Sequence, residues 1–249
     1  MKIGIIGTGN IGTTLIRKLT RAGHDILMAN SRGPETLNEL AEETGAQAVS
    51  AEKAIQGVNV LILSIPLSKL PLMKELLAQL PDKVTVADTS NYYPSRDGNI
   101  LALDSGLAES VWVSEQIGHP VIKAWNNVMA GTFADKGLPP GANGRLALSV
   151  AGDDPAAKKT IMSLVEDTGF DAIDGGSLAE SWCQQPGTPG YCTELTAEEL
   201  RKALAAADRS RAPQVRDEVM RQLALRDFKV SNEDILRLTR STAAELASG

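Results

Sequence analysis

The chain has 249 residues, enough to bury a substantial core in one large domain or in a main domain with an appendage. Its formal net charge of -6 argues against nucleic acid or an anionic membrane as the default partner. No apolar run approaches the roughly 20 residues that span a bilayer, and the first one is too short for a signal peptide, so we expect a cytoplasmic protein.

Short aliphatic runs alternate with helical periods from residue 2 to about residue 125. The runs that we interpret as strands are, in chain order, KIGIIG, DILMAN, AQAVS, VNVLILSIP, KVTVADTS and HPVIKAW. Between them, one helical stripe consists of Ile11, Leu15, Ile16 and Leu19, and another of Leu72, Met73, Leu76, Leu77 and Leu80. This succession predicts right-handed crossovers and an α/β fold with a doubly wound, mostly parallel sheet.

The second half begins after the loop KGLPPGANG. Two further strands, RLALSVAG and FDAIDGG, flank a helix that Asp154 would cap. From about residue 195 the pattern is helical, with a capping box at Thr196 and Glu199. We therefore divide the chain into a main domain over residues 1–144 and a smaller part over residues 145–249, with two strands and a helical tail, which need not fold independently.

A glycine motif follows the first strand and opens the first helix. Gly7, Gly9 and Gly12 satisfy G-x-G-x-x-G, the fingerprint of a dinucleotide-binding Rossmann fold. Gly7 permits the tight turn, Gly9 lets a pyrophosphate approach the backbone, and Gly12 allows close helix–strand packing. The N–H groups at the helix start would then hold the pyrophosphate.

The end of the second strand selects between the two nicotinamide cofactors. A site specific for NAD usually carries Asp or Glu there, whereas this chain has Asn30, Ser31 and Arg32. A guanidinium suits a phosphate, and a carboxylate would repel it. The sequence therefore predicts NADP(H) rather than NAD(H).

The stretch GTGNIGTTLIRKLTRAGHDILMANSRGPE, with LILSIP and VIKAWNNV, resembles the family of NADPH:coenzyme F-420 oxidoreductases. F-420 is a deazaflavin, and the likeness covers about residues 1–175. The cytosolic domain of the STEAP metalloreductases, which reduces a flavin with NADPH, is similar too. The resemblance implies a pyrophosphate cradle at Thr8, Gly9, Asn10 and Ile11, a 2′-phosphate site at Ser31 and Arg32, and a nicotinamide pocket at Ser64, Ile65 and Pro66. Asn126 stands where some archaeal members carry a histidine near the deazaflavin.

Candidates for the acceptor side come after the fifth and sixth strands. They are Asn91, Tyr92 and Tyr93, followed by Trp125 and Asn126. At most one of the two tyrosines should line a site, because neighbours in an extended segment face opposite ways. Trp125 serves equally well as a core residue, His119 favours a structural role, and Lys123 either faces the ligand or reaches solvent from an edge strand. Cys183 and Cys192 are expected to be free thiols, and no metal site is predicted.

These observations favour an enzyme that passes a hydride between NADP(H) and a flat acceptor, either coenzyme F-420 or a flavin such as FMN or FAD. No side chain is predicted to perform acid–base catalysis, because the two cofactors carry the reactivity. An NADPH-dependent imine or carbonyl reductase and a sensor that binds NADPH without turnover stay open. The stripe Val215, Val219 and Leu223 needs a partner surface, which could be a second copy in a homodimer or the chain's own sheet.

Overall fold

A six-stranded parallel sheet forms the centre of the computed structural model, which describes residues 1–247 and the side chains of residues 1–242. The strands, in chain order, are β1 (Lys2–Ile6), β2 (Asp25–Ala29), β3 (Gln47–Ala48), β4 (Val60–Leu63), β5 (Thr85–Asp88) and β6 (Val121–Lys123). They lie in the order β3-β2-β1-β4-β5-β6, and every pair is parallel. This is the Rossmann order, so the predicted fold class is confirmed.

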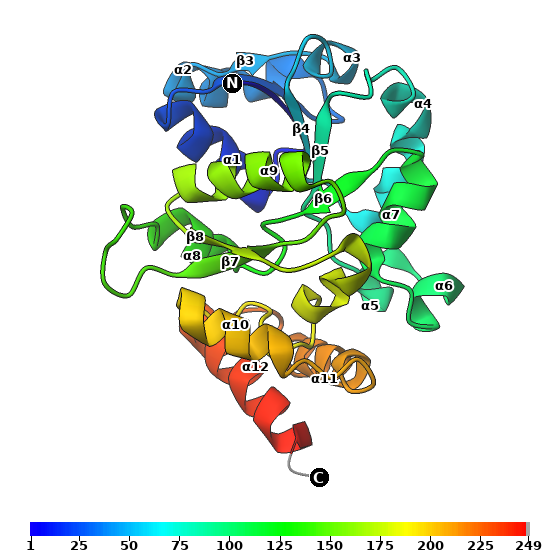
Figure 1. Cartoon of the computed structure of the whole chain (residues 1–249), viewed down its shortest axis with the longest axis vertical. Helices are drawn as coiled ribbons and strands as arrows, with labels where there is room; N and C mark the ends of the chain where they lie inside the picture. Colours follow the sequence, from blue (N-terminus) through cyan, green and yellow to red (C-terminus); the bar gives the residue numbers. More distant parts are fainter. Residues whose placement is uncertain (248–249) are drawn as a thin grey trace.

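Helices cover both faces of the sheet (Figure 1). The elements of this part are α1 (Asn10–Arg21), η1 (Pro34–Leu37), α2 (Asn38–Thr44), α3 (Ala51–Ala54), η2 (Leu67–Met73), α4 (Lys74–Leu77), α5 (Pro94–Asp97), α6 (Leu101–Asp104), α7 (Glu109–Ile117) and α8 (Ala130–Asp135). Alternate residues of β4 enter different cores: Val60 and Ile62 pack on the α1 side, and Leu61 and Leu63 pack on the α7 side. The almost wholly apolar run that we interpreted as a covered strand is therefore buried on both faces.

One predicted helix differs from expectation. The stripe from residue 72 to 80 does not lie on one long helix, because residues 67–73 form the 3-10 helix η2 and the α-helix α4 that follows ends at Leu77. Leu72 is 76% exposed instead of buried. The apolar spacing here did not produce a continuous helix.

The two additional strands form a separate two-stranded sheet, which one antiparallel bridge joins to β6. β7 (Ala147–Val150) and β8 (Asp171–Asp174) pair in parallel, and α9 (Pro155–Asp167) connects them. Lys123 and Ala151 exchange two backbone hydrogen bonds in antiparallel fashion, with N–O distances of 2.8 and 3.0 Å. Asp154 caps α9 as predicted, accepting from the N–H groups of Ala156 and Ala157 at 2.7 and 3.0 Å.

The C-terminal tail is helical as predicted. After η3 (Leu178–Gln184) it consists of α10 (Ala197–Ala205), α11 (Ala212–Ala224) and α12 (Asn232–Ala247), drawn in yellow to red in Figure 1. The predicted capping box is present, with Thr196 N and Oγ1 donating to Glu199 at 2.9 and 2.7 Å. The stripe on α11 faces the chain itself: Val215 and Leu223 are buried, and Val219 lines a cavity. Dimerisation stays a prediction, but this stripe already has its partner surface.

None of the described helices is long and apolar enough to cross a membrane.

Candidate functional site

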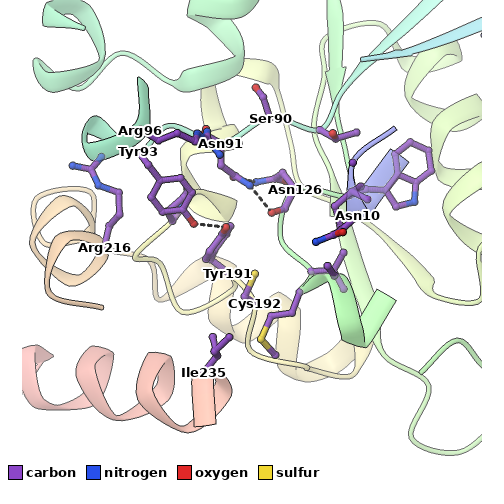
Figure 2. Close-up of a pocket in the computed structure, with 18 of the residues that line it drawn as sticks. Asn10, Ser90, Asn91, Tyr93, Arg96, Asn126, Tyr191, Cys192, Arg216 and Ile235 are labelled. Carbon is purple, nitrogen blue, oxygen red and sulfur yellow. Dashed lines mark hydrogen bonds between the residues drawn. The ribbon is translucent and has the colours of Figure 1, made fainter. Parts of the chain in front are cut away.

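A cavity of about 490 Å3 lies between the carboxyl ends of the central strands and the helical tail. This is the edge at which open parallel sheets place their ligands. One end, which we call the glycine-loop end, is formed by Gly9–Ile11 and Ser64–Pro66. The other, the arginine end, is formed by Tyr93, Arg96 and Arg216 (Figure 2). α11 and α12 supply a largely apolar wall, which consists of Val219, Met220, Leu223, Asn232, Ile235 and Thr239.

The three glycines of the motif have different surroundings. Gly7 has φ +107°, and a Cβ on it would lie 2.1 Å from the Ser64 carbonyl oxygen. A Cβ on Gly12 would lie 1.9 Å from the Gly7 carbonyl oxygen. A Cβ on Gly9 would meet no atom within 4 Å among the described residues. Packing therefore requires Gly7 and Gly12, whereas Gly9 borders an open cradle at the start of α1, as a bound pyrophosphate requires.

The end of β2 is held to the glycine loop by one side chain that we had not singled out as a contact. Asn30 donates from Nδ2 to the hydroxyls of Thr8 and Thr36, at 3.3 and 3.0 Å, and accepts from Arg32 N at 2.9 Å. Ser31 and Arg32 are exposed, outside the cavity. Among the described residues the Arg32 guanidinium has no hydrogen-bond or ion-pair partner, so it can receive a phosphate.

The predicted nicotinamide segment follows β4 and lines the cavity. Ser64 N donates to the Ile6 carbonyl at 2.8 Å, which fixes this segment beside the end of β1. Ile65 and Pro66 then pass along the cavity wall before η2 begins. Asn10 and Ile11 line the same end, so the sequence-predicted residues of both segments come together.

Asn126 lines the cavity, but its amide is already paired. Nδ2 donates to Asn91 Oδ1 at 3.0 Å and to the Gln184 carbonyl at 2.8 Å, while Oδ1 accepts from Gln184 Nε2 at 2.8 Å. Asn91 in turn donates to the Asn126 carbonyl at 2.9 Å. The geometry therefore makes Asn126 a positioning residue, which ties the end of β6 to the segment after β5 and to η3.

The two tyrosines after β5 face opposite ways, as predicted. Tyr93 lines the cavity, whereas Tyr92 is 2% exposed and lies outside it. The Tyr92 hydroxyl donates toward Asp104 Oδ1 at 2.9 Å and accepts from Ile100 N at 2.9 Å. Of the two candidates, Tyr92 is thus structural and Tyr93 is placed to meet a ligand.

Trp125 belongs mainly to the core. Its side chain is fully buried, and Nε1 donates to Thr168 Oγ1 at 3.3 Å. It contributes to the cavity wall but presents no free polar atom there. Its φ of 55° is unusual for a bulky residue and turns the chain sharply after β6.

Two phenols meet in the cavity wall. The hydroxyls of Tyr93 and Tyr191 lie 2.6 Å apart (Figure 2). Burial raises the pKa of both phenols well above the ordinary value, and burial also raises the pKa of the adjacent Cys192 thiol to about 12. These groups keep their protons near neutral pH, so the pair can donate one hydrogen bond but supplies no anionic nucleophile.

Lys123 points neither to the ligand nor to solvent, which corrects both alternatives. Its Nζ is buried, 3.3 Å from Asp88 Oδ2 and 3.6 Å from Glu109 Oε2, and it donates to the Ser90 carbonyl. Ser110 Oγ also donates to Asp88 at 2.6 Å. Burial raises the pKa of the Glu109 carboxyl to about 7, although Lys123 opposes the shift. The cluster holds the segment 89–91 in place through the Ser90 carbonyl.

His119 contacts the Pro120 carbonyl at 2.8 Å, consistent with a structural role.

Part of the cavity wall carries no signal in the sequence. The segment WCQQPGTPGY, which matches no motif, supplies Pro186, Gly187 and Tyr191 to the wall. Arg96 and Arg216 come from different helices 120 positions apart and belong to no local motif. The helical periodicity did predict the apolar side of α11, but it could not predict that this side forms a wall of the cavity.

Cys183 and Cys192 are free thiols.

The sheet order, the glycine loop and the cavity beside it define a Rossmann-fold protein of the NAD(P)-binding oxidoreductase class. Residues 2–92 match the family described as NADP oxidoreductase, coenzyme F420-dependent. The chain belongs to this family, as the resemblance in its motifs indicated.

Three individual proteins illustrate the relationship. YjhV of Escherichia coli K12 is 54% identical over 70 residues, which cover 28% of this chain and 51% of YjhV. Metalloreductase STEAP3 of Rattus norvegicus is 28% identical over 180 residues, or 72% of this chain and 35% of STEAP3. The crystal structure of SMa0349 from Sinorhizobium meliloti superposes with a TM-score of 0.67 at 30% identity, covering 79% of this chain and 95% of that one. The chain thus spans about half of the first curated relative and about a third of the second.

Proposed function

We propose that this protein transfers a hydride between NADP(H) and a flat deazaflavin or flavin acceptor. The observation that carries the proposal is the continuity of the cavity. It begins at the glycine-loop end, where a dinucleotide would bind, and continues past Ser64–Pro66 under the helical tail. Two flat rings could therefore stack in one cavity, and hydride transfer between cofactors requires such close approach.

The residues present fit NADP(H). The open cradle at Gly9 and the N–H groups at the start of α1 would hold the pyrophosphate, and Arg32 would contact the 2′-phosphate. Asn30 positions the backbone of Arg32 relative to Thr8. When bound, NADPH supplies the hydride. The chain itself would bind and orient the cofactor: Ser64–Pro66 would lie beside the nicotinamide, and Val219, Met220 and Ile235 form part of an apolar wall that would limit its contact with water.

A second candidate, the reduction of an imine or a carbonyl, is favoured by the phenol pair. Such a substrate needs a proton donor as well as a hydride. The Tyr93 and Tyr191 hydroxyls share one hydrogen bond, and Tyr191 also contacts the Cys192 thiol. When Tyr191 donates to Tyr93, the Tyr93 proton is left to direct at a ligand in the cavity.

The test is a hydride-transfer assay on the purified protein. NADPH and NADH are each paired with coenzyme F420, FMN and FAD, and the loss of each chromophore is followed. Turnover with NADPH and any of these acceptors supports the proposal. Tight binding of NADPH without turnover contradicts it and directs the search to imines and carbonyls, or to a sensor.

A further inference from the structure

Three amide side chains are joined by hydrogen bonds behind and along the wall of the cavity. Gln184 on η3 is 1% exposed and Asn126 after β6 is 2% exposed, whereas Asn91 after β5 is half-buried. Asn126 and Asn91 line the cavity, but Gln184 does not. The three amides therefore connect the interior of the protein to the surface of the cavity.

Backbone carbonyls, which can only accept, fix the orientation of the two buried amides. Gln184 Nε2 uses both of its N–H groups, donating to the Ser149 carbonyl at 3.1 Å and to Asn126 Oδ1 at 2.8 Å. The nitrogen of Asn126 lies on its other side and donates to the Gln184 carbonyl at 2.8 Å and to Asn91 Oδ1 at 3.0 Å. Turning either amide over would place oxygen against oxygen at a buried site, where an unpaired acceptor is costly.

The third amide, Asn91, is oriented by the other two. Its Oδ1 accepts from Asn126 Nδ2, and its own Nδ2 donates to the Asn126 carbonyl at 2.9 Å. An amide nitrogen carries two N–H groups, and the second one of Asn91 has no acceptor in the described part of the chain. The cavity wall therefore offers a ligand one amide donor, which is oriented before the ligand arrives, and this lowers the entropic cost of binding.

A free amide N–H is matched by a carbonyl oxygen on the ligand. Figure 2 shows the pair of Asn91 and Asn126 between Asn10, at the glycine-loop end, and Tyr93, at the arginine end. The groups that would hold the dinucleotide phosphates lie at the glycine loop and at Arg32. The amide donor is thus placed for the second ligand of the cavity, beyond the dinucleotide.

We propose that Asn91 donates a hydrogen bond to a carbonyl oxygen of the hydride acceptor, and that Gln184 is the positioning residue that fixes this donor. The inference rests on the proposed function and names the residues that recognise the acceptor ring. Gln184 acts through Asn126: its two N–H groups determine which way the Asn126 amide is turned, and Asn126 determines which way the Asn91 amide is turned.

This hydrogen bond becomes stronger when the hydride is transferred. The transfer breaks a C–H bond of NADPH, and the hydride forms a new bond to the acceptor ring and brings its electron pair. The carbonyl oxygens of a flavin or deazaflavin ring take up part of the added negative charge, until a proton from water neutralises the ring. Since hydrogen bonds to charged groups are stronger than neutral ones, Asn91 binds the reduced ring more tightly than the oxidised ring.

The experiment measures how tightly the full chain binds each redox form of an acceptor. FMN and coenzyme F420 are titrated without oxygen, each in its oxidised and its chemically reduced form. We expect the preference for the reduced form, the ratio of the two Kd values, to fall about fivefold to tenfold in Asn91→Leu, which removes the donor. Gln184→Met, which removes the two N–H groups behind it, should lower the same ratio. The Kd for NADPH should stay within about twofold in both variants.

Two exposed positions supply matched controls. Asn99→Leu and Gln214→Met change the same side chains outside the cavity and should keep the wild-type ratio. Gln184→Met leaves the Ser149 carbonyl without a donor, so thermal melts check that the variant folds. A variant that only loosens the fold weakens both redox forms equally and leaves the ratio unchanged. If Gln184→Met does not fold, Asn91→Leu, at a half-buried position, still tests the donor.

The outcomes separate this inference from the proposed function. An unchanged ratio in Asn91→Leu overturns the inference and leaves the proposed function standing. A weaker Kd for NADPH with an unchanged ratio overturns it too, and places the donor on the nicotinamide carboxamide. A fall in Asn91→Leu but not in a folded Gln184→Met overturns the role of Gln184. The expected fall without NADPH-linked turnover supports the inference and contradicts the proposed function, and failure of both acceptors to bind overturns both.

Discussion

The two ends of the cavity are constructed differently. The glycine-loop end consists of two short segments, Gly9–Ile11 and Ser64–Pro66, each directly after a strand of the sheet. The groups that this end offers a ligand are backbone N–H groups and the open space beside Gly9, which has no Cβ. The arginine end consists of side chains from α5, α11 and the segment after β5, with Tyr191 from the loop before α10 beside them.

Because of this difference, the two ends would recognise a ligand in different ways. Backbone N–H groups at a helix start recognise a diphosphate whatever side chains surround them, because the fold fixes their geometry. Guanidinium groups and phenols recognise an acceptor only if distant helices bring them together. Substitutions can therefore test each end separately. The largest effect on stability is expected at the buried cluster of Lys123, Asp88 and Glu109, which lies behind the cavity.

Removing the buried cation behind the cavity should have the largest effect. Lys123→Met leaves the Asp88 and Glu109 carboxylates buried without their cation. We expect a loss of about 3–5 kcal/mol in the free energy of unfolding, measured by urea denaturation. Lys159→Met, at an exposed position, is the control and should change stability by less than about 0.5 kcal/mol. Similar small losses in both variants would contradict the described role of the cluster.

The same cluster predicts a pH dependence. The Glu109 carboxyl titrates near pH 7 in the native state and near 4.5 when unperturbed. The native state therefore binds this proton more tightly than the unfolded state does. The stabilisation that the bound proton provides is complete below about pH 4.5 and is lost as the pH rises through about 7. Lys123, Asp88 and Arg216 are the charged groups around it.

Glu109→Gln should abolish this loss, since glutamine cannot release a proton. Between pH 5 and pH 7, the free energy of unfolding of the wild type should fall relative to that of the variant by about 1 kcal/mol per pH unit. Urea denaturation of both proteins at several pH values measures the difference. A difference that stays constant across that range would show that Glu109 does not titrate there.

At the glycine-loop side, Arg32→Ala should affect one cofactor only. Loss of a charge-assisted hydrogen bond to the 2′-phosphate, about 1.5–3 kcal/mol, predicts a tenfold to hundredfold weaker binding of NADPH. NADH lacks that phosphate and serves as the internal control. Fluorescence titration measures both dissociation constants, and equal losses for the two cofactors would refute the predicted specificity.

Two alanine substitutions in the glycine loop should have opposite consequences. In Gly9→Ala the new methyl group meets open space, so the fold should be kept while NADPH binds about tenfold or more weakly. In Gly12→Ala it would lie 1.9 Å from the Gly7 carbonyl oxygen, so stability should fall by about 1–3 kcal/mol or more. Thermal melts with and without NADPH distinguish the two. A Gly9→Ala protein that binds NADPH normally would show that the cradle is not used.

The smallest effects should separate two neighbouring tyrosines. Tyr92→Phe removes a hydroxyl that contacts Asp104 and Ile100, and should cost about 1 kcal/mol of stability without changing the KM for the acceptor. Tyr93→Phe breaks the phenol pair in the cavity wall and should change the acceptor KM. Urea denaturation and steady-state kinetics of both variants measure these effects. If the acceptor KM responded to Tyr92→Phe alone, the assignment of the two faces would be wrong.

Much of the fold was predictable because its signals are local. The parallel strands, the caps of α9 and α10 and the roles of Gly7 and Gly12 depend on residues a few positions apart. The helix expected through Leu72 was wrong because residues 67–73 form a 3-10 helix and α4 spans only Lys74–Leu77. The alternatives offered for Lys123 were wrong because its partners, Asp88 and Glu109, lie on different elements.

By itself, the sequence determined the Rossmann sheet and the position of the glycine loop, and it predicted a phosphate site at the end of β2. These features follow from residue order along single strand–turn–helix units, where neighbours in sequence are neighbours in space. Only the tertiary structure decided that Asn126 is a positioning residue, that Tyr191 meets Tyr93, and that Arg96 and Arg216 both line the cavity. Each of these pairings joins residues dozens of positions apart, and the packing of η3, the loop after it and α11 against the sheet brings them together.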